Sequence, residues 1–233
     1  MTEVTPSGAG VVPASAPRRR GRIGERNRRR ILAAAERVFA RRGYRGSTLD
    51  EIAKESNLPK ANLLYYFKSK QALYHAVITD ILEAWLSALG EISIDDDPAE
   101  ALTGYIERKM AMSRERPEGS RVFAMEVITG APVIGEYLRG ALRDWVERQG
   151  AVFRVWQRRG MMADLSPEHV FFAIWALTQT YADFSPQVTA VLGVERLEEA
   201  DYRLAVGTVT EIILRGLGVP PRRVGRVAAV PSG

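Results

Sequence analysis

Three side chains at four-residue spacing, Trp175, Gln179 and Asp183, could together bind a small planar molecule. On a helix this spacing places them on one face. An indole ring offers a stacking surface, a Gln amide both donates and accepts, and a carboxylate accepts from an N–H group. A small polar ring requires such paired groups in an otherwise apolar pocket. The pattern indicates a ligand site, which Phe123 and Glu126 on a neighbouring helix could close.

The same face also has a purely structural interpretation. Trp175 could belong to the hydrophobic core, while Gln179 and Asp183 could bond to helix ends or across a dimer interface. The residues alone leave both interpretations open.

A second set of residues has the chemistry of DNA contacts: Thr48, Lys60, Asn62, Tyr66 and Lys70. Lysine ammonium groups neutralise phosphates, and a hydroxyl at a helix start offers a donor to another phosphate. Lys60 and Lys70 are therefore candidate phosphate contacts. Asn62 is the candidate base contact, because its amide can pair bidentately with adenine. The alternative is that all five are solvated residues on a small helical bundle.

Two short amphipathic segments would position this second set. Thr48 and Glu51 have the spacing of a capping box, and Asn57 tolerates the left-handed conformation of a tight turn. Pro59 has its angle preset for a helix start, and the next helix is expected to run to about Phe67. Helices separated by about three residues must cross steeply. This is the helix-turn-helix arrangement, whose second helix enters the major groove.

Helical periodicity continues through the rest of the chain. A first helix is expected over about 25–42, ended by Gly43, and a longer one from 70 to about 92 after Ser69. Further helices are expected at about 98–115, 118–129, 132–159, 167–184 and 195–217. No run alternates long enough to predict a strand. The prediction is an all-α fold with an N-terminal three-helix DNA-binding domain and a larger C-terminal helical ligand-binding and dimerisation domain.

Charge separates the two ends of the chain. Residues 1–70 contain 16 Lys and Arg against 6 Asp and Glu, whereas residues 71–233 contain 17 against 22. Such a split suggests a nucleic-acid-binding end, the alternative being a solvated basic tail on an ordinary domain. The arginines between Arg18 and Arg30 are expected to add phosphate or minor-groove contacts.

Composition and motifs predict four regions. Residues 1–22 are expected to form a disordered basic arm, 23–70 the helix-turn-helix domain, 71–219 the ligand-binding and dimerisation domain, and 220–233 a flexible tail.

Several functions are excluded or disfavoured. The chain has no cysteine and only two histidines, so disulfides, thiol nucleophiles and Cys or His metal sites are not expected. Glu126 with His169 or Asp183 could be imagined as an acid/base pair, but nothing supplies a nucleophile, metal cluster or phosphate loop. We expect neither an enzyme nor a cofactor. Without an apolar leader or a long uncharged segment, the protein is expected to be cytoplasmic.

One helix face is predicted to pack between subunits. It combines Phe171, Ile174, Leu177, Thr178 and Tyr181 with Ala205, Gly207 and Thr208. A glycine inside a helix costs roughly 1 kcal/mol against alanine, which favours a packing reason for Gly207. Two helices from each subunit would form a four-helix interface, the alternative being an intramolecular core.

The DNA-binding segment resembles the TetR family of regulators. The resemblance covers about residues 25–74 and is carried by the motifs at 48–53, 58–67 and 69–73. It implies an all-helical homodimer whose C-terminal domain binds a small effector and thereby releases an operator. Thr48, Lys60, Asn62, Tyr66 and Lys70 match family positions that commonly touch DNA. The chain departs from the family pattern at three positions, Leu64, Tyr66 and Pro59, and Leu64 replaces a customary phosphate contact.

Further segments, 62–67, 120–126, 130–132 and 174–184, are similar to members of this family that regulate pyrimidine utilisation. This similarity implies a pyrimidine nucleobase such as uracil or thymine as effector. The same architecture with an unrelated hydrophobic small molecule or drug is the alternative.

Overall fold

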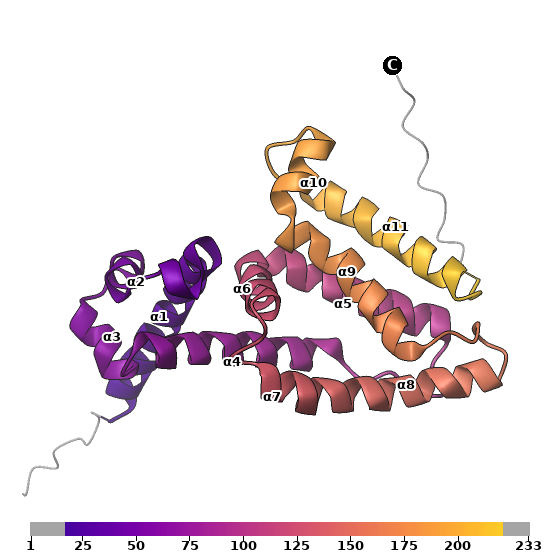
Figure 1. Ribbon diagram of the computed structural model, residues 1–233, viewed down its shortest axis with the longest axis horizontal. Coiled ribbons are helices and arrows are strands. Elements are labelled where there is room, and N and C mark those ends of the chain that lie inside the picture. Colours follow the sequence, from indigo (N-terminus) through magenta and orange to yellow (C-terminus); the bar gives the residue numbers. More distant parts are fainter. Residues whose placement is uncertain (1–16, 221–233) are drawn as a thin grey trace, which may run out of the picture.

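The computed structural model describes residues 17–220, apart from the side chains of residues 17–21 and 86–89. This part of the chain is helical, with no strand among the described residues (Figure 1). The elements are α1 (Pro17–Gly46), α2 (Leu49–Ser56), α3 (Lys60–Tyr66), α4 (Lys70–Leu89), α5 (Pro98–Glu115), α6 (Pro117–Ile128), α7 (Gly135–Tyr137), the π-helical segment η1 (Leu138–Leu142), α8 (Arg143–Arg158), α9 (Pro167–Asp183), α10 (Ser185–Leu192) and α11 (Glu199–Gly216). The predicted all-α fold is confirmed.

The helix-turn-helix forms for the local reasons read from the sequence. Thr48 caps α2 and completes the capping box with Glu51, and Asn57 ends the helix in the left-handed conformation with φ 50°. Pro59 occupies the N-cap of α3 rather than its first turn, so α3 begins at Lys60. Leu63 and Phe67 are buried against α1 and α4, which fixes the orientation of α3.

The first helix is longer than the prediction. It begins at Pro17, not near residue 25, so the expected disordered arm of residues 1–22 is wrong for residues 17–22. Arginine has a high helix propensity, and nothing after Pro17 interrupts the helix until Gly43, whose φ is 67°. Residues 1–16 of the expected arm lie outside the described residues, as do residues 221–233 of the expected tail.

The long helix α4 joins the two halves of the molecule (Figure 1). It ends at Leu89 because Gly90 has φ 66°, three residues before the expected end near Ile92. We call the helix-turn-helix domain formed by α1, α2 and α3 the reading head. Its buried core continues along α4 from Leu73 to Trp85 and includes Val122 of α6 and Ile134. The first core therefore extends well past residue 70, where the predicted DNA-binding domain ends.

A second core is formed by α5, α8, α9 and α11. Aromatic rings fill it: Phe153 and Phe171 lie 4.9 Å apart, and Trp145 and Phe171 lie 5.1 Å apart. Phe171, Ile174 and Thr178 are each 0% exposed within the one chain. The predicted subunit-packing face on α9 is therefore wrong, and its alternative, an intramolecular core, is correct. Ala205 of α11 is buried in the same core.

The face that α9 and α11 leave uncovered is a different one. Large apolar side chains on it are exposed: Phe172 by 52%, Leu204 by 72% and Ile212 by 53%. Leu204, Thr208 and Ile212 follow each other at four-residue spacing along one side of α11. Within the described residues, no helix is long and apolar enough to span a membrane.

Candidate functional site

The outer side of α3 is the candidate DNA-contacting surface. Leu63 is fully buried, whereas Leu64 is 40% and Tyr65 75% exposed. Lys60 is exposed at the start of the helix and makes a 2.9 Å ion pair with Asp50 of α2. Because this pair is open to solvent, it contributes little to stability and leaves Lys60 available to another anion.

Two of the predicted DNA-binding residues on α3 are half-buried rather than fully exposed. Asn62 and Tyr66 lie at the edge of the exposed face, and Tyr66 also packs against the first core. A Cβ on Gly24 of α1 would lie 3.7 Å from the Tyr66 hydroxyl, so Tyr66 reaches back towards α1. Tyr65, which the sequence prediction omitted, is the aromatic that projects most. Within the consecutive residues 65–67, composition alone could not decide which ring faces outwards.

Thr48 and Lys70 are both engaged within the chain. The Thr48 hydroxyl accepts a hydrogen bond from the Glu51 backbone N–H at 3.2 Å and donates one to Glu51 Oε2 at 3.1 Å. The Lys70 ammonium donates to the carbonyl oxygens of Tyr44 at 2.8 Å and Ser47 at 2.9 Å, and it lies 4.6 Å from the Tyr44 ring centroid. An ammonium has three donors, so one N–H of Lys70 is left after these two bonds.

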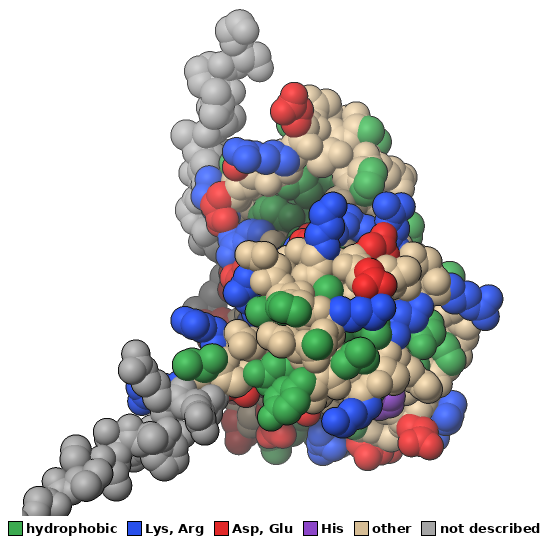
Figure 2. Space-filling view, turned by 90° about the vertical axis from the view of Figure 1, so that its left-hand side faces the viewer, with side chains coloured by type: hydrophobic (Ala, Val, Ile, Leu, Met, Phe, Trp, Pro, Cys, Tyr) green, Lys and Arg blue, Asp and Glu red, His purple; other side chains and the backbone are tan. Residues whose placement is uncertain are grey.

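This end of the molecule is rich in cations. Figure 2 views it directly and shows Lys and Arg side chains spread over the face, with hydrophobic groups between them. Exposed arginines of α1, among them Arg22, Arg26, Arg29 and Arg30, extend the basic surface beyond α2 and α3. Such a surface is suited to a phosphate backbone.

The candidate effector site is a polar cluster enclosed by α4, α5, α6 and α9. Ser120 of α6 donates to Asp183 Oδ1 at 2.5 Å. Lys109 of α5 is only 5% exposed and interacts electrostatically with Asp183. Burial lowers the pKa of Lys109 to about 8, although Asp183 opposes the shift. Burial likewise raises the pKa of Asp183, against the opposing effects of Ser120, Lys109 and Arg121.

Aromatic rings border this cluster. The Lys109 ammonium lies 4.9 Å from the Trp85 ring centroid, and the rings of Trp85 and Phe123 meet at 4.8 Å. One turn earlier on α5, the Tyr105 hydroxyl accepts a 2.7 Å hydrogen bond from Trp175 Nε1. Gln179 is half-buried and lies on α9 between Trp175 and Asp183.

Several donors in this region lack an acceptor. Trp85 Nε1 and Arg121 Nε are buried without a hydrogen-bond partner among the described residues, and the Lys109 ammonium lies over the Trp85 ring beside them. Buried donors are nearly always paired in native proteins, so unpaired ones indicate a missing partner. Sequence reasoning missed Trp85, Lys109 and Arg121 because they lie on three different helices. A lysine within the apolar face of α5 was the available signal.

Glu126 is not part of the cluster. It is 3% exposed, and its Oε2 accepts from the Tyr74 hydroxyl at 2.8 Å. Its Oε1 accepts from the backbone N–H groups of Val133 at 2.5 Å and Ile134 at 3.3 Å. Both oxygens therefore anchor the turn after α6 to α4, which makes Glu126 a structural residue in this arrangement. Of the five predicted ligand residues, Phe123 and Asp183 border the cluster directly, and Trp175 and Gln179 extend it along α9.

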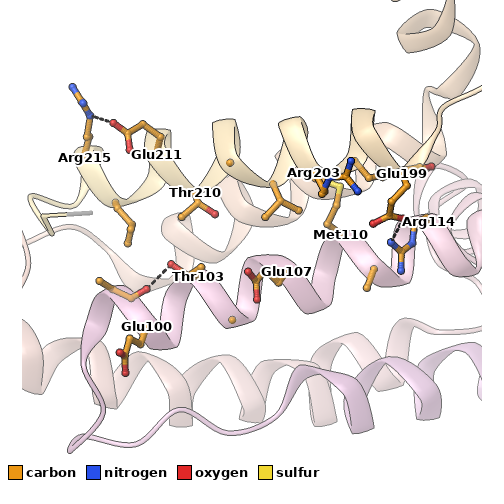
Figure 3. A pocket seen from close by; sticks show the side chains of 17 residues that line it. Glu100, Thr103, Glu107, Met110, Arg114, Glu199, Arg203, Thr210, Glu211 and Arg215 are labelled. Carbon is orange, nitrogen blue, oxygen red and sulfur yellow. Dashed lines mark hydrogen bonds and ion pairs between the residues drawn. The ribbon is translucent and has the colours of Figure 1, made fainter. Parts of the chain in front are cut away.

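A groove of about 1090 Å³ lies elsewhere, between α5 and α11 (Figure 3). Its floor includes Met110, Val206 and Leu214, and the ion pair between Arg114 and Glu199 lies at one end. None of the predicted ligand residues lines it. It contains no charged group as buried as Lys109, so the enclosed cluster remains the better candidate for an effector.

Comparison with known proteins matches a family model to each half of the chain. Residues 31–77 match the family model for bacterial regulatory proteins of the tetR family, and residues 78–220 match that for the C-terminal region of YcdC-like protein. The HTH-type transcriptional regulator RutR of Escherichia coli strain K12 is 40% identical over 199 residues, which cover 85% of this chain and 94% of RutR. The chain belongs to the TetR family.

Solved structures of other proteins share the fold. The transcriptional regulator SCO4942 of Streptomyces coelicolor superimposes with a TM-score of 0.64 at 25% identity, covering 83% of this chain and 99% of SCO4942. AibR, solved with isovaleryl coenzyme A and operator DNA, gives 0.63 at 18% identity over 83% of this chain and 99% of AibR. The chain is thus a ligand-responsive transcriptional regulator of the TetR type, similar to RutR, and not an enzyme.

Proposed function

We propose that this TetR-type regulator is a dimeric repressor that binds a palindromic operator and releases it when a pyrimidine nucleobase, uracil or thymine, occupies the cluster around Lys109 and Asp183. The two α3 helices would enter successive major grooves about 34 Å apart. The observation that carries the effector proposal is a pair of buried donors without partners in the described part of the chain, Trp85 Nε1 and Arg121 Nε, near Lys109 and the half-buried carboxylate of Asp183.

The donors and the acceptor correspond to the two kinds of polar group on a dioxopyrimidine. Its carbonyl oxygens would accept from Lys109 and Trp85, while a ring N–H would donate to Asp183. Trp85 and Phe123 offer ring surfaces beside these groups. An unrelated hydrophobic effector would offer no acceptor to the buried Trp85 Nε1 or to Lys109, and buried donors without an acceptor are costly. The resemblance to regulators of pyrimidine utilisation supports the same ligand class.

Calorimetric titration with uracil, thymine and cytosine tests this proposal. Cytosine carries an amino group where uracil has a carbonyl, so it offers a donor to a site rich in donors. We expect binding of uracil or thymine, weaker binding of cytosine, and at least a tenfold loss of affinity in Lys109→Met. A folded protein that produced no heat with any of the three would refute the pyrimidine effector.

We also propose that dimerisation uses the exposed apolar face of α9 and α11, with Phe172 and Ala176 on α9 and Leu204, Thr208 and Ile212 on α11. Two helices from each subunit would then form a four-helix interface.

Transcription from an operator-bearing template distinguishes repressor from activator. A repressor lowers transcript yield, and the effector restores it.

A further inference from the structure

Three charged side chains from different parts of the chain meet where the reading head contacts the effector domain. Arg116, immediately before α6, donates from Nε to Glu36 Oε1 at 2.9 Å and from Nη2 to Glu36 Oε2 at 2.6 Å. The same Nη2 donates to Asp80 Oδ2 at 2.6 Å. Glu36 belongs to α1 and Asp80 to α4, so one guanidinium connects both helices to the start of α6.

The Arg116–Glu36 part of this cluster is largely shielded from solvent. The Glu36 side chain is 9% exposed and that of Arg116 is 29% exposed. Burial alone would lower the pKa of Arg116, but the bonds to Glu36 and Asp80 raise the pKa above its ordinary value, so the arginine stays charged. Without it, two carboxylates would face each other, one of them buried, and the α1–α4–α6 junction would lose its counter-charge.

Gly119 in the first turn of α6 provides the space for this ion pair. A Cβ at position 119 would lie 3.1 Å from both Arg116 Cγ and Glu36 Oε1. The backbone of α6 therefore lies directly against the ion pair. A side chain at position 119 would therefore crowd the Arg116–Glu36 contact.

The same turn also reaches the proposed effector site. Ser120 donates its side chain to Asp183 and its backbone N–H to the Arg116 carbonyl at 3.2 Å. Arg121, the next residue, carries one of the unpaired buried donors. Arg116, which contacts α1 and α4, is thus four positions from Ser120 and five from Arg121, which lie beside the proposed effector site.

We propose that Arg116 is a positioning residue that fixes the orientation of the reading head relative to α6, and that the effector acts on operator affinity by moving the first turn of α6 and with it this arginine. The second half of this statement rests on the effector site proposed above. The first half does not depend on any ligand.

The experiment compares Arg116→Gln with a matched control, Tyr74→Phe. Tyr74 makes the other buried polar link between α4 and α6, through Glu126, and does not touch Arg116. Operator affinity is measured by fluorescence anisotropy with and without uracil, and uracil binding is measured separately by calorimetry. Arg116→Lys, which keeps the charge but not the forked geometry, should recover the function only in part.

We expect Arg116→Gln to bind uracil within about twofold of the parent while its effector-induced change in operator Kd falls at least about fivefold, the lower end of ordinary allosteric coupling. Its operator affinity without uracil should also fall, whereas Tyr74→Phe should retain both values. Gly119→Ala, which crowds the pair without removing a charge, should change the same two quantities.

The possible failures are distinguishable. If uracil binds the parent and releases DNA equally well from Arg116→Gln, transmission through Arg116 is wrong. If Arg116→Gln and Tyr74→Phe have the same effector-free operator affinity, the positioning role is wrong. If the parent binds no uracil, the proposed effector is wrong, and the effector-free comparison still decides the role of Arg116.

Discussion

Lys109 is a side chain whose burial is unfavourable for the stability of the fold and useful for the proposed ligand binding. It is held at 5% exposure between Trp85 and Asp183, where burial lowers its pKa to about 8 from an ordinary 10.5. A folded protein gains little from a buried ammonium with partial compensation. Retaining one is reasonable where a ligand supplies the missing acceptor.

This residue predicts a pH dependence of stability. Between pH 8 and 10.5 the unfolded chain keeps the Lys109 proton that the folded chain has lost, so this residue's contribution to stability rises with pH across that window. The contribution should be on the order of 2 kcal/mol. Urea unfolding of the parent and of Lys109→Met at pH 7.5 and 9.5 measures the difference. Equal pH dependence in the two proteins would contradict the lowered pKa of Lys109 in the folded protein.

Glu126 illustrates the opposite case, a buried charge whose bonds are all internal. In Glu126→Leu the Tyr74 hydroxyl and the backbone N–H groups of Val133 and Ile134 lose their shared acceptor. An unpaired buried donor costs about 2 kcal/mol. We expect a lower urea midpoint and unchanged uracil affinity. Loss of uracil binding at unchanged stability would instead indicate that Glu126 contacts the effector, as the sequence predicted.

At the scale of elements, the helix-turn-helix depends on a few end signals. The capping box of α2 uses Thr48, whose hydroxyl is also the predicted phosphate contact. Thr48→Ala should lose about 1 kcal/mol of stability together with operator affinity. Thr48→Ser keeps the hydroxyl that caps α2 and faces Glu51 Oε2, so it should retain both. Parental operator affinity in Thr48→Ala, measured by gel-shift titration, would contradict the predicted phosphate contact.

The exposed face of α3 gives a second prediction at this scale. Tyr65 is 75% exposed, so Tyr65→Ala should leave the thermal midpoint within the error of measurement. If α3 lies in the major groove, the same change should reduce operator affinity at least several-fold in gel-shift titrations. Tyr66→Ala, which removes a ring packed on the first core, should instead lower stability. Parental operator affinity in Tyr65→Ala would show that this face of α3 does not enter the major groove.

The elements were more predictable than the faces they present. Capping residues and left-handed turns are local, so Thr48 and Asn57 marked the start and end of α2 in agreement with the structure, while Gly43 is a kink within α1, which ends at Gly46. The direction of a face depends on distant partners. Phe171 and Ile174 are covered by α5 and α8, which no local pattern around α9 reveals. The effector cluster was half predicted for the same reason, because Lys109 and Trp85 belong to other helices.

At the scale of the whole molecule, an uncovered apolar surface predicts assembly. Leu204 is 72% and Ile212 53% exposed on one side of α11. Leu204→Arg should introduce like charges across a twofold interface and yield a monomer in sedimentation experiments, with weaker operator binding. The secondary structure by circular dichroism should be unchanged, because neither side chain contributes to the core. A dimer that persisted in Leu204→Arg would place the interface elsewhere.

The continuity of the first core has a consequence for chimeric regulators. Leu73, Val77, Ile81 and Trp85 of α4 share buried contacts with α1, α2 and α3, and Val122 and Ile134 join them. A hybrid protein spliced at residue 70 would combine a reading head with a foreign α4 and leave that shared interior mismatched. Exchange of operator specificity between relatives should therefore succeed when the crossover falls after Gly90 and the facing residues of α6 are transplanted with it.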